Sequence, residues 1–265
     1  MKKLISLTIL FVLSLILALW QPLQSVQYKI ADTFFSPQQV RSKITIVAID
    51  DASLDPANAL GRFRDWPRSY YSEAVKALAQ HTPAVIGLDL DFREKSRGLS
   101  DARLKQLMTE YEKLAEAGQA SGFNWYRIIE SAQAQHPDDA DFQKTLNEGG
   151  PVVLFGSLAL KEDGSPGEFT PPIFSGPAIT VGYSNTLLDR DGVLRRFTPQ
   201  MGGYISFPYA LAQAYAIATG GQTDFLAALP ERTTPLRYVA TPGSYNTISF
   251  ADVLKGKFDP SLVTG

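Results

Sequence analysis

Two short apolar runs, each followed by carboxylates, bracket the most informative stretch of the chain, residues 44–94. The runs read ITIVAI at residues 44–49 and AVIGL at residues 84–88. Between them, residues 69–80 repeat apolar side chains at the spacing of an amphipathic helix. Short runs rich in Val and Ile on both sides of such a helix predict a βαβ unit with two buried parallel strands.

Charged residues gather where these predicted strands end. A right-handed crossover brings the carboxyl ends of both strands to one edge of the sheet, so we expect Asp50 to lie near Asp89. The helix begins at the same edge, from which Arg68 can reach these carboxylates. Such contacts could hold the loop and cap the helix, or they could mark a functional site. The candidates at this edge are Asp50, Asp51, Trp66, Arg68, Asp89 and Asp91.

Later segments continue the same alternation of strands and helices. Residues 138–150 begin with acidic side chains and end in two glycines, which predicts a helix. A third buried strand is predicted at residues 151–160, and a further helix at residues 204–220, begun at Ser206. Residues 161–176 are rich in Pro and Gly and predict a mobile surface loop. The predicted fold class is α/β, a mostly parallel sheet flanked by helices.

A helical insertion interrupts this pattern at about residues 95–137. The segment DARLKQLMTEYEKLAEA places apolar side chains on one helical face, and WYRIIESAQ gives a second, shorter helix after a Gly-containing break. A helical hairpin is expected. It could be a decoration without chemistry, a dimerisation surface or a ligand lid.

The N-terminus predicts a membrane attachment. Two lysines precede an apolar run at residues 4–20, which is at the short end of what spans a bilayer. The length of the run and its poor cleavage site favour an uncleaved signal anchor, residues 1–24, over a cleaved signal peptide. The lysines place the following residues outside the cytoplasm, so residues 25–265 are expected to form an extracytoplasmic domain.

Composition removes several function classes. The chain of 265 residues has no cysteine, which excludes disulfides, thiol catalysis and thiolate metal sites. Its net charge of −2, without a basic stripe, argues against a nucleic-acid partner. No Gly-rich phosphate loop or nucleophile elbow is present.

The sequence Asp189-Arg190-Asp191-Gly192 presents carboxylates in a turn-like setting. An EF-hand loop places its glycine at the sixth position, whereas counting from Asp189 puts Gly192 at the fourth. The sequence therefore favours a tight turn in which Asp side chains accept local backbone amides. An ion or ligand contact stays open as the alternative.

The order of these pieces resembles the CHASE2 domain, an extracytoplasmic sensor module of bacterial transmembrane receptors. The pieces are IDDASL, a Gly-containing loop, WPR, GLDLDF, DDADF, PVVLFGSL and YSNTLLDRDGVLRRFTP, and they cover most of residues 28–265. Two features depart from the family pattern: GRFRDWPR stands where a compact W-P-W-P-R run is usual, and an insertion separates Glu94 from Pro137. The resemblance adds four candidates at recurring positions of the pattern: Asn185, Asp189, Asp191 and Arg195.

The resemblance implies a sensory domain without catalytic residues or a cofactor. It further implies that residues 1–265 belong to a longer receptor, with later transmembrane helices and a cytoplasmic kinase or nucleotide cyclase. The expected partners are the membrane, through the N-terminal helix, and a small molecule or envelope stimulus that the sequence leaves unknown. The receptor could be a homodimer.

A periplasmic hydrolase is the alternative from a different class. It would use Asp50, Asp89 and Asp91 around a divalent metal, since Asp89-Leu90-Asp91 has the spacing of an aspartyl-phosphate site. Arg93 occupies the position where such enzymes usually carry Thr.

Overall fold

The computed structural model describes most of the chain between residues 43 and 264. The described residues are 8–12, 14–15, 30, 32–33, 43–58, 60–96, 101–135, 137–186, 188–189, 191–227, 229, 233–236, 238, 241 and 243–264. Two compact units divide the chain. The larger comprises Arg41–Asn185, Thr198–Thr234 and Tyr245–Gly265, and the smaller comprises Met1–Val40, Thr186–Phe197 and Pro235–Ser244.

The three elements of the predicted βαβ unit are present in the larger unit. They are β1 (Thr45–Ala48), α4 (Arg68–Ala79) and β2 (Ile86–Leu88). The expectation that the two strands are neighbours is wrong for the described pairings, because β1 pairs in parallel with β10 (Asn246–Ser249) and β2 pairs in parallel with β3 (Val152–Leu160). The short NTIS segment near the end of the chain supplies the partner of β1. Its four residues carry too weak a pattern to be ranked beside the longer apolar runs.

Strand β3 is the centre of the main sheet. It pairs in parallel with β2 on one edge and with β5 (Ile179–Tyr183) on the other. Its outer half also pairs antiparallel with β4 (Pro166–Thr170). The predicted mobile loop at residues 161–176 is therefore wrong in its middle, because Phe169 and its neighbours form a strand. The described strands make several small sheets, mostly parallel, so the α/β class is confirmed but one large sheet is not.

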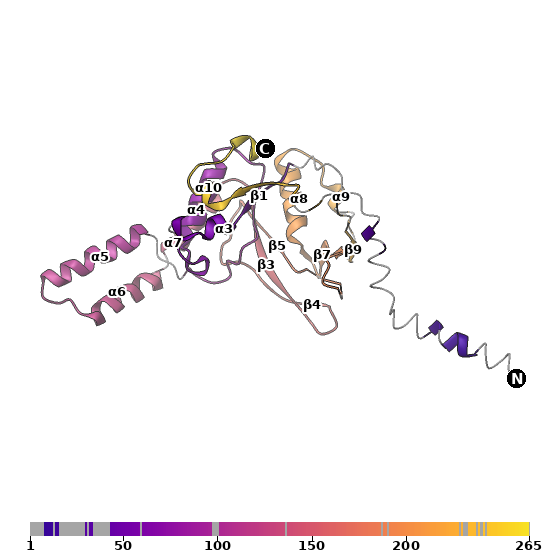
Figure 1. Ribbon diagram of the computed structural model, residues 1–265, viewed down its shortest axis with the longest axis horizontal. Coiled ribbons are helices and arrows are strands. Elements are labelled where there is room, and N and C mark those ends of the chain that lie inside the picture. Colours follow the sequence, from indigo (N-terminus) through magenta and orange to yellow (C-terminus); the bar gives the residue numbers. More distant parts are fainter. Residues whose placement is uncertain are drawn as a thin grey trace. The chain divides into compact units, whose positions relative to one another are not determined.

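Helices cover both faces of β3 (Figure 1). Val152 and Leu154 belong to the core cluster formed with α4 and α7 (Pro137–Glu148). Val153, which points to the opposite face, packs with Phe207 and Ala210 of α8 (Phe207–Ala218). Because neighbouring side chains of a strand alternate between faces, burial on both faces explains why this strand reads as a continuous apolar run.

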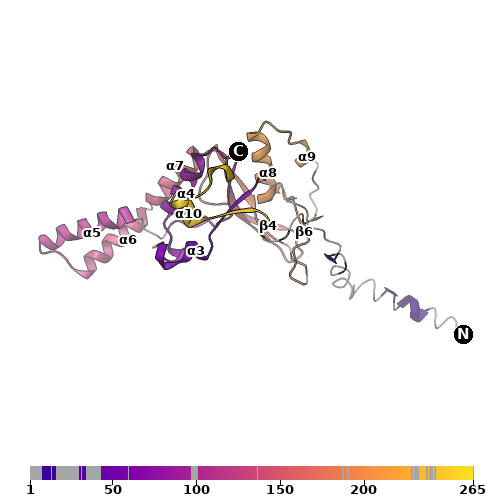
Figure 2. The same ribbon diagram turned by 45° about the horizontal axis from the view of Figure 1, so that its top comes forward.

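Aromatic rings fill the face of the sheet covered by α4 and α7. Phe142 contacts Phe92 with ring centroids 5.2 Å apart and Phe174 at 5.0 Å, and Tyr71 lies 5.5 Å from Phe92. Helix α10 (Phe250–Leu254) packs against α4 on this side (Figure 2). Helix α4, which lies between β1 and β2 in the chain, is thus held by this shared core.

The insertion forms the expected helical hairpin. Helices α5 (Asp101–Glu116) and α6 (Gly122–Gln135) pack on each other, with the rings of Tyr111 and Trp125 5.2 Å apart. Its role as decoration, dimerisation surface or lid stays a prediction.

The predicted anchor, residues 1–24, lies largely outside the described residues, of which 8–12 and 14–15 are helical. None of the described helices is both long and apolar enough to cross a bilayer. The remaining short elements are α3 (Asp51–Leu54), η1 (Pro56–Asn58), η2 (Phe63–Asp65), β6 (Arg196–Phe197), β7 (Gln200–Met201), β8 (Tyr204–Ile205), α9 (Asp224–Ala227), β9 (Thr234–Pro235) and η3 (Pro260–Leu262).

Candidate functional site

Asp50 is a helix cap that joins two strand ends. Its Oδ1 accepts hydrogen bonds from the Ser53 amide at 2.9 Å, the Ser53 hydroxyl at 2.8 Å and the Ser249 hydroxyl at 2.8 Å. Asp50 follows β1 and Ser249 ends β10, so one carboxylate fastens the two paired strands where α3 begins. Burial opposes ionisation of Asp50, but the hydrogen bonds outweigh it and hold its pKa below the usual value.

The other carboxylates of the predicted edge are more exposed. Asp51 lies exposed in the first turn of α3, and Asp89 is exposed after β2. Asp91 accepts hydrogen bonds from the guanidinium of Arg93 at 2.9 and 2.5 Å. This bond to Arg93 lowers the pKa of Asp91 against the opposing effect of burial. Among the described residues, no group of three His, Asp or Glu side chains could hold a metal ion.

Trp66 anchors the start of α4 in the core. Its indole N–H donates to the carbonyl of Gly61 at 3.2 Å, and its ring stacks on Phe250 with centroids 5.3 Å apart. Only 4% of Trp66 is exposed. The following Pro67 is the N-cap residue of α4, and no side chain caps this end of the helix by a hydrogen bond. The WPR segment therefore sets where α4 begins through packing.

Arg68 joins α4, α7 and the segment after β2. Its Nε lies 3.3 Å from a carboxylate oxygen of Asp139, and its Nη2 donates to the carbonyl of Glu94 at 2.7 Å. Asp139 also accepts from the amide of Ser96. The side chains of Arg68 and Asp139 are both only 11% exposed. The prediction that Arg68 contacts Asp50 and Asp89 is wrong. Arg68 instead pairs with Asp139, in the first turn of α7.

An aromatic face completes the surroundings of Arg68. Its guanidinium carbon lies 4.7 Å from the centroid of Phe92 and 5.9 Å from that of Phe174. A cation over an aromatic face is favourable, more so where water is excluded. The arrangement is a packed charged junction between three segments of the larger unit.

Asn185 braces the central strand. Its carboxamide accepts from the amide of Leu158 at 3.2 Å and donates to the carbonyl of the same residue at 2.5 Å. Both backbone groups of one β3 residue are therefore satisfied by a single side chain. This contact gives Asn185 a structural role in the domain.

Arg195 is the centre of a second charged cluster, which lies within the smaller unit. It contacts Asp191 at 2.9 Å, Asp189 at 3.2 Å and Asp32 at 2.6 Å. Asp189, whose side chain is 2% exposed, also binds Arg196. The hydrogen bonds to Arg195 hold the pKa values of Asp32 and Asp191 below their usual range, against the effect of burial. The cluster joins residue 32, which follows the N-terminal apolar run, to the turn at residues 189–192.

The turn itself has the predicted form. The amide of Gly192 donates to the Asp189 carbonyl at 2.9 Å, and the amide of Val193 donates to the Asp191 carboxylate at 3.3 Å. Gly192 has a φ of +79°, which favours glycine at this point. The guanidinium groups on these carboxylates are an addition that turn chemistry alone does not predict.

Comparison with models of protein families identifies the family of this chain. The model of the CHASE2 domain family matches residues 8–265. The chain belongs to the CHASE2 family. Comparisons with curated proteins and with solved structures gave no match.

CHASE2 domains are sensory modules of receptors, which gives this CHASE2 domain a sensory role and agrees with a segment that carries no catalytic activity. The match spans both charged clusters, so the Arg68 junction and the Arg195 cluster are parts of one family domain. Sequence reasoning missed Asp139, Asp32 and Ser249 as partners. The paired aspartates of DDADF at the start of a helix were the signal available for Asp139.

Proposed function

We propose that residues 25–265 form the extracytoplasmic input domain of a bacterial inner-membrane receptor that signals to a cytoplasmic kinase or nucleotide cyclase. The CHASE2 match over residues 8–265 carries this proposal. The lysines before the apolar run at residues 4–20 support the orientation. In this role residues 1–24 are the anchor and the stimulus is a small molecule or an envelope condition.

The Arg195 cluster supplies a route by which a stimulus would reach the membrane. One guanidinium, that of Arg195, binds both Asp32 and Asp191. Asp32 follows the anchor, and Asp191 lies in the turn from Asp189 to Gly192. A shift of the turn would therefore pull on the segment that leaves the anchor. A stimulus can drive such a shift only if it binds two states of the domain with different affinity.

Fusions to two reporter proteins test the topology. Alkaline phosphatase is active only after export, and green fluorescent protein fluoresces only when it folds in the cytoplasm. We expect a phosphatase fused after residue 265 to be active and the fluorescent protein fused at the same point to be dark. Fluorescence together with an inactive phosphatase would contradict the extracytoplasmic placement.

A further inference from the structure

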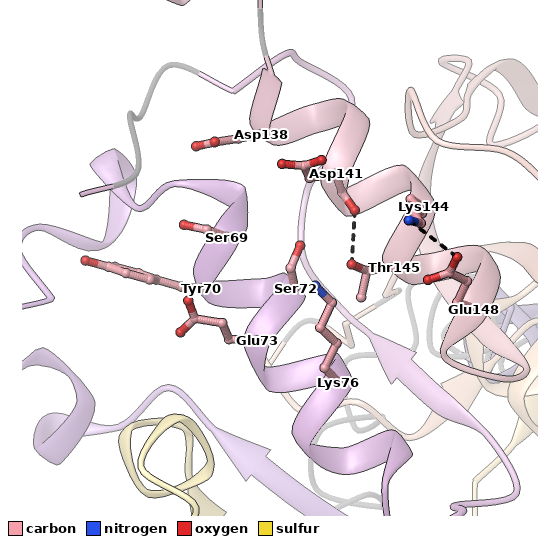
Figure 3. Close-up of a pocket in the computed structure, with 10 residues that line it drawn as sticks. All are labelled: Ser69, Tyr70, Ser72, Glu73, Lys76, Asp138, Asp141, Lys144, Thr145 and Glu148. Carbon is pink, nitrogen blue, oxygen red and sulfur yellow. Dashed lines mark hydrogen bonds and ion pairs between the residues drawn. The ribbon is translucent and has the colours of Figure 1, made fainter. Parts of the chain in front are cut away.

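Helices α4 and α7 enclose a polar groove that none of the described charged clusters uses. Its volume is about 670 Å³, within the range of small-molecule sites. Figure 3 shows the two helices side by side, with Ser72 and Lys76 of α4 pointing toward α7. These are Ser69, Tyr70, Ser72, Glu73, Lys76, Asp138, Asp141, Lys144, Thr145 and Glu148.

A buried hydroxyl in this groove lacks a hydrogen-bond partner. Ser72 is 4% exposed, and its Oγ makes no hydrogen bond within the part of the chain that the structure describes. Leaving a buried hydroxyl unpaired is unfavourable, and such groups are rare in folded proteins. Ser72 faces α7, where the hydroxyl of Thr145 donates to the Asp141 carbonyl and keeps its own oxygen available as an acceptor (Figure 3).

The charges of the groove are ordered in the same direction on both walls. On α4, Glu73 comes three residues before Lys76, and on α7, Asp141 comes three residues before Lys144. The two helices run the same way in Figure 3, where Asp138 and Asp141 lie toward the start of α7 and Lys144 and Glu148 lie further along it. Lys144 has an exposed pair with Glu148 at 3.9 Å. Neither Asp141 nor Lys76 has an ion-pair partner among the described residues, so these charges are available to a ligand.

We propose that the α4–α7 groove binds a small zwitterion of the amino-acid class that carries excess positive charge. Its ammonium groups contact Asp141 and the Ser72 hydroxyl, and its carboxylate contacts Lys76. The groove has four carboxylates against two lysines, which selects a ligand of net positive charge. The proposal deepens the sensory role and rests on it for its biological meaning.

The position of the groove connects binding to the Arg68 junction. Ser69 and Asp138 of the groove directly adjoin Arg68 and Asp139 in sequence, and this pair ties α4 to α7. A ligand held between the same two helices would change their separation at the junction. Because Arg68 also binds the segment after β2, that segment would be displaced as well.

Calorimetry on the full chain purified in detergent tests the proposal, with L-lysine as the probe and cadaverine as its analogue without a carboxylate. We expect saturable one-to-one binding of L-lysine and weaker binding of cadaverine. Ser72→Ala should weaken L-lysine binding about tenfold, the loss of roughly one hydrogen bond to a charged group. Because the substitution removes an unpaired hydroxyl, it should leave the thermal unfolding temperature of the free protein unchanged or raised.

Two charge variants and their matched controls sharpen the result. Asp141→Asn should weaken both probes, whereas Lys76→Met should abolish the preference for L-lysine over cadaverine. Glu168→Gln and Lys257→Met, which are exposed and outside the groove, should leave both affinities unchanged. Absence of L-lysine binding to the folded wild type, or equal affinity in Ser72→Ala and wild type, would overturn the groove assignment.

The outcomes separate the groove from the sensory role. If the wild type binds neither probe while the topology fusions give the expected result, the groove assignment fails and the sensory role stands. If the groove variants lose binding but receptor output never responds to L-lysine, the site stands and its use as a sensor input fails.

Discussion

Arg68 shows how one side chain can set the geometry of a domain edge. Its guanidinium binds a carboxylate from another helix and a backbone carbonyl from the segment after β2, and it lies against two aromatic rings. Pairing of a buried charge offsets its desolvation only when the geometry and the additional hydrogen bonds are good. Removing one partner therefore costs more than the pair itself contributes.

Arg68→Met should lower the free energy of unfolding by about 3 kcal/mol, because Asp139 is left as an unpaired buried charge. Urea denaturation followed by circular dichroism measures the loss. Arg64→Met is the matched control, since Arg64 is 77% exposed and its contact with Asp65 at 3.5 Å is solvated. That control should change stability by less than about 0.5 kcal/mol. Equal effects of the two substitutions would contradict the account of the junction.

Individual partners were harder to predict from the sequence than the residues themselves. The position of Arg68 at a helix start identified it as a charged contact, but its carboxylate partner lies 71 residues further along the chain. The partner depends on how far α7 reaches along α4, which is set by packing of the shared core. Asp32 is likewise joined to Arg195 across 163 residues, a separation over which local patterns carry no information.

At the scale of elements, close backbone approach fixes how α8 sits on the main sheet. A Cβ added to Gly182 of β5 would lie 2.6 Å from the Cα and 2.7 Å from the backbone nitrogen of Phe207, the first residue of α8. Backbone atoms cannot yield as the end of a flexible side chain can. The glycine therefore permits the contact between strand and helix.

Gly182→Ala should destabilise the domain by about 2 kcal/mol or more, as overpacking against a backbone does. Gly122→Ala is its control, because no atom lies within 4 Å of the added Cβ and α6 begins there. Alanine at that position should leave stability unchanged or raise it by up to about 1 kcal/mol. Thermal unfolding of both variants measures the difference, and a neutral Gly182→Ala would show that the two elements are not packed as closely as described.

The elements themselves follow from local pattern wherever apolar periodicity is strong. Residues 69–80, 151–160 and 204–220 predicted α4, β3 and α8 because each carries a run long enough to bury a face. Strand β4 was missed because it lies in a segment rich in Gly and Pro, and it forms through hydrogen bonds to β3. The partner of β1 was missed because the pairing of strands far apart in the chain is not visible in a local pattern.

At the scale of the whole molecule, we expect the Arg195 cluster to link the sensory domain to the output of the receptor. Asp32 and Asp191 hold pKa values lowered by hydrogen bonds from Arg195. A lowered folded-state pKa means that the contact contributes above the unfolded value of about 3.8 and is lost as the pH falls through the folded-state value. The link between residue 32 and the turn is therefore closed at neutral and mildly acidic pH.

Asp32→Asn in the intact receptor should change its basal output, because it removes the charge that ties the segment after the proposed anchor to Arg195. Half of the Asp32 side chain is exposed, so its loss should leave the thermal unfolding temperature nearly unchanged. Arg196→Ala is the control: Arg196 binds Asp189 but has no described contact with Asp32, so the link at residue 32 stays in place. Kinase or cyclase activity in membranes, with thermal unfolding measured in parallel, separates a signalling effect from a folding effect. Equal output from wild type and Asp32→Asn would exclude this link as the route from the domain to the membrane.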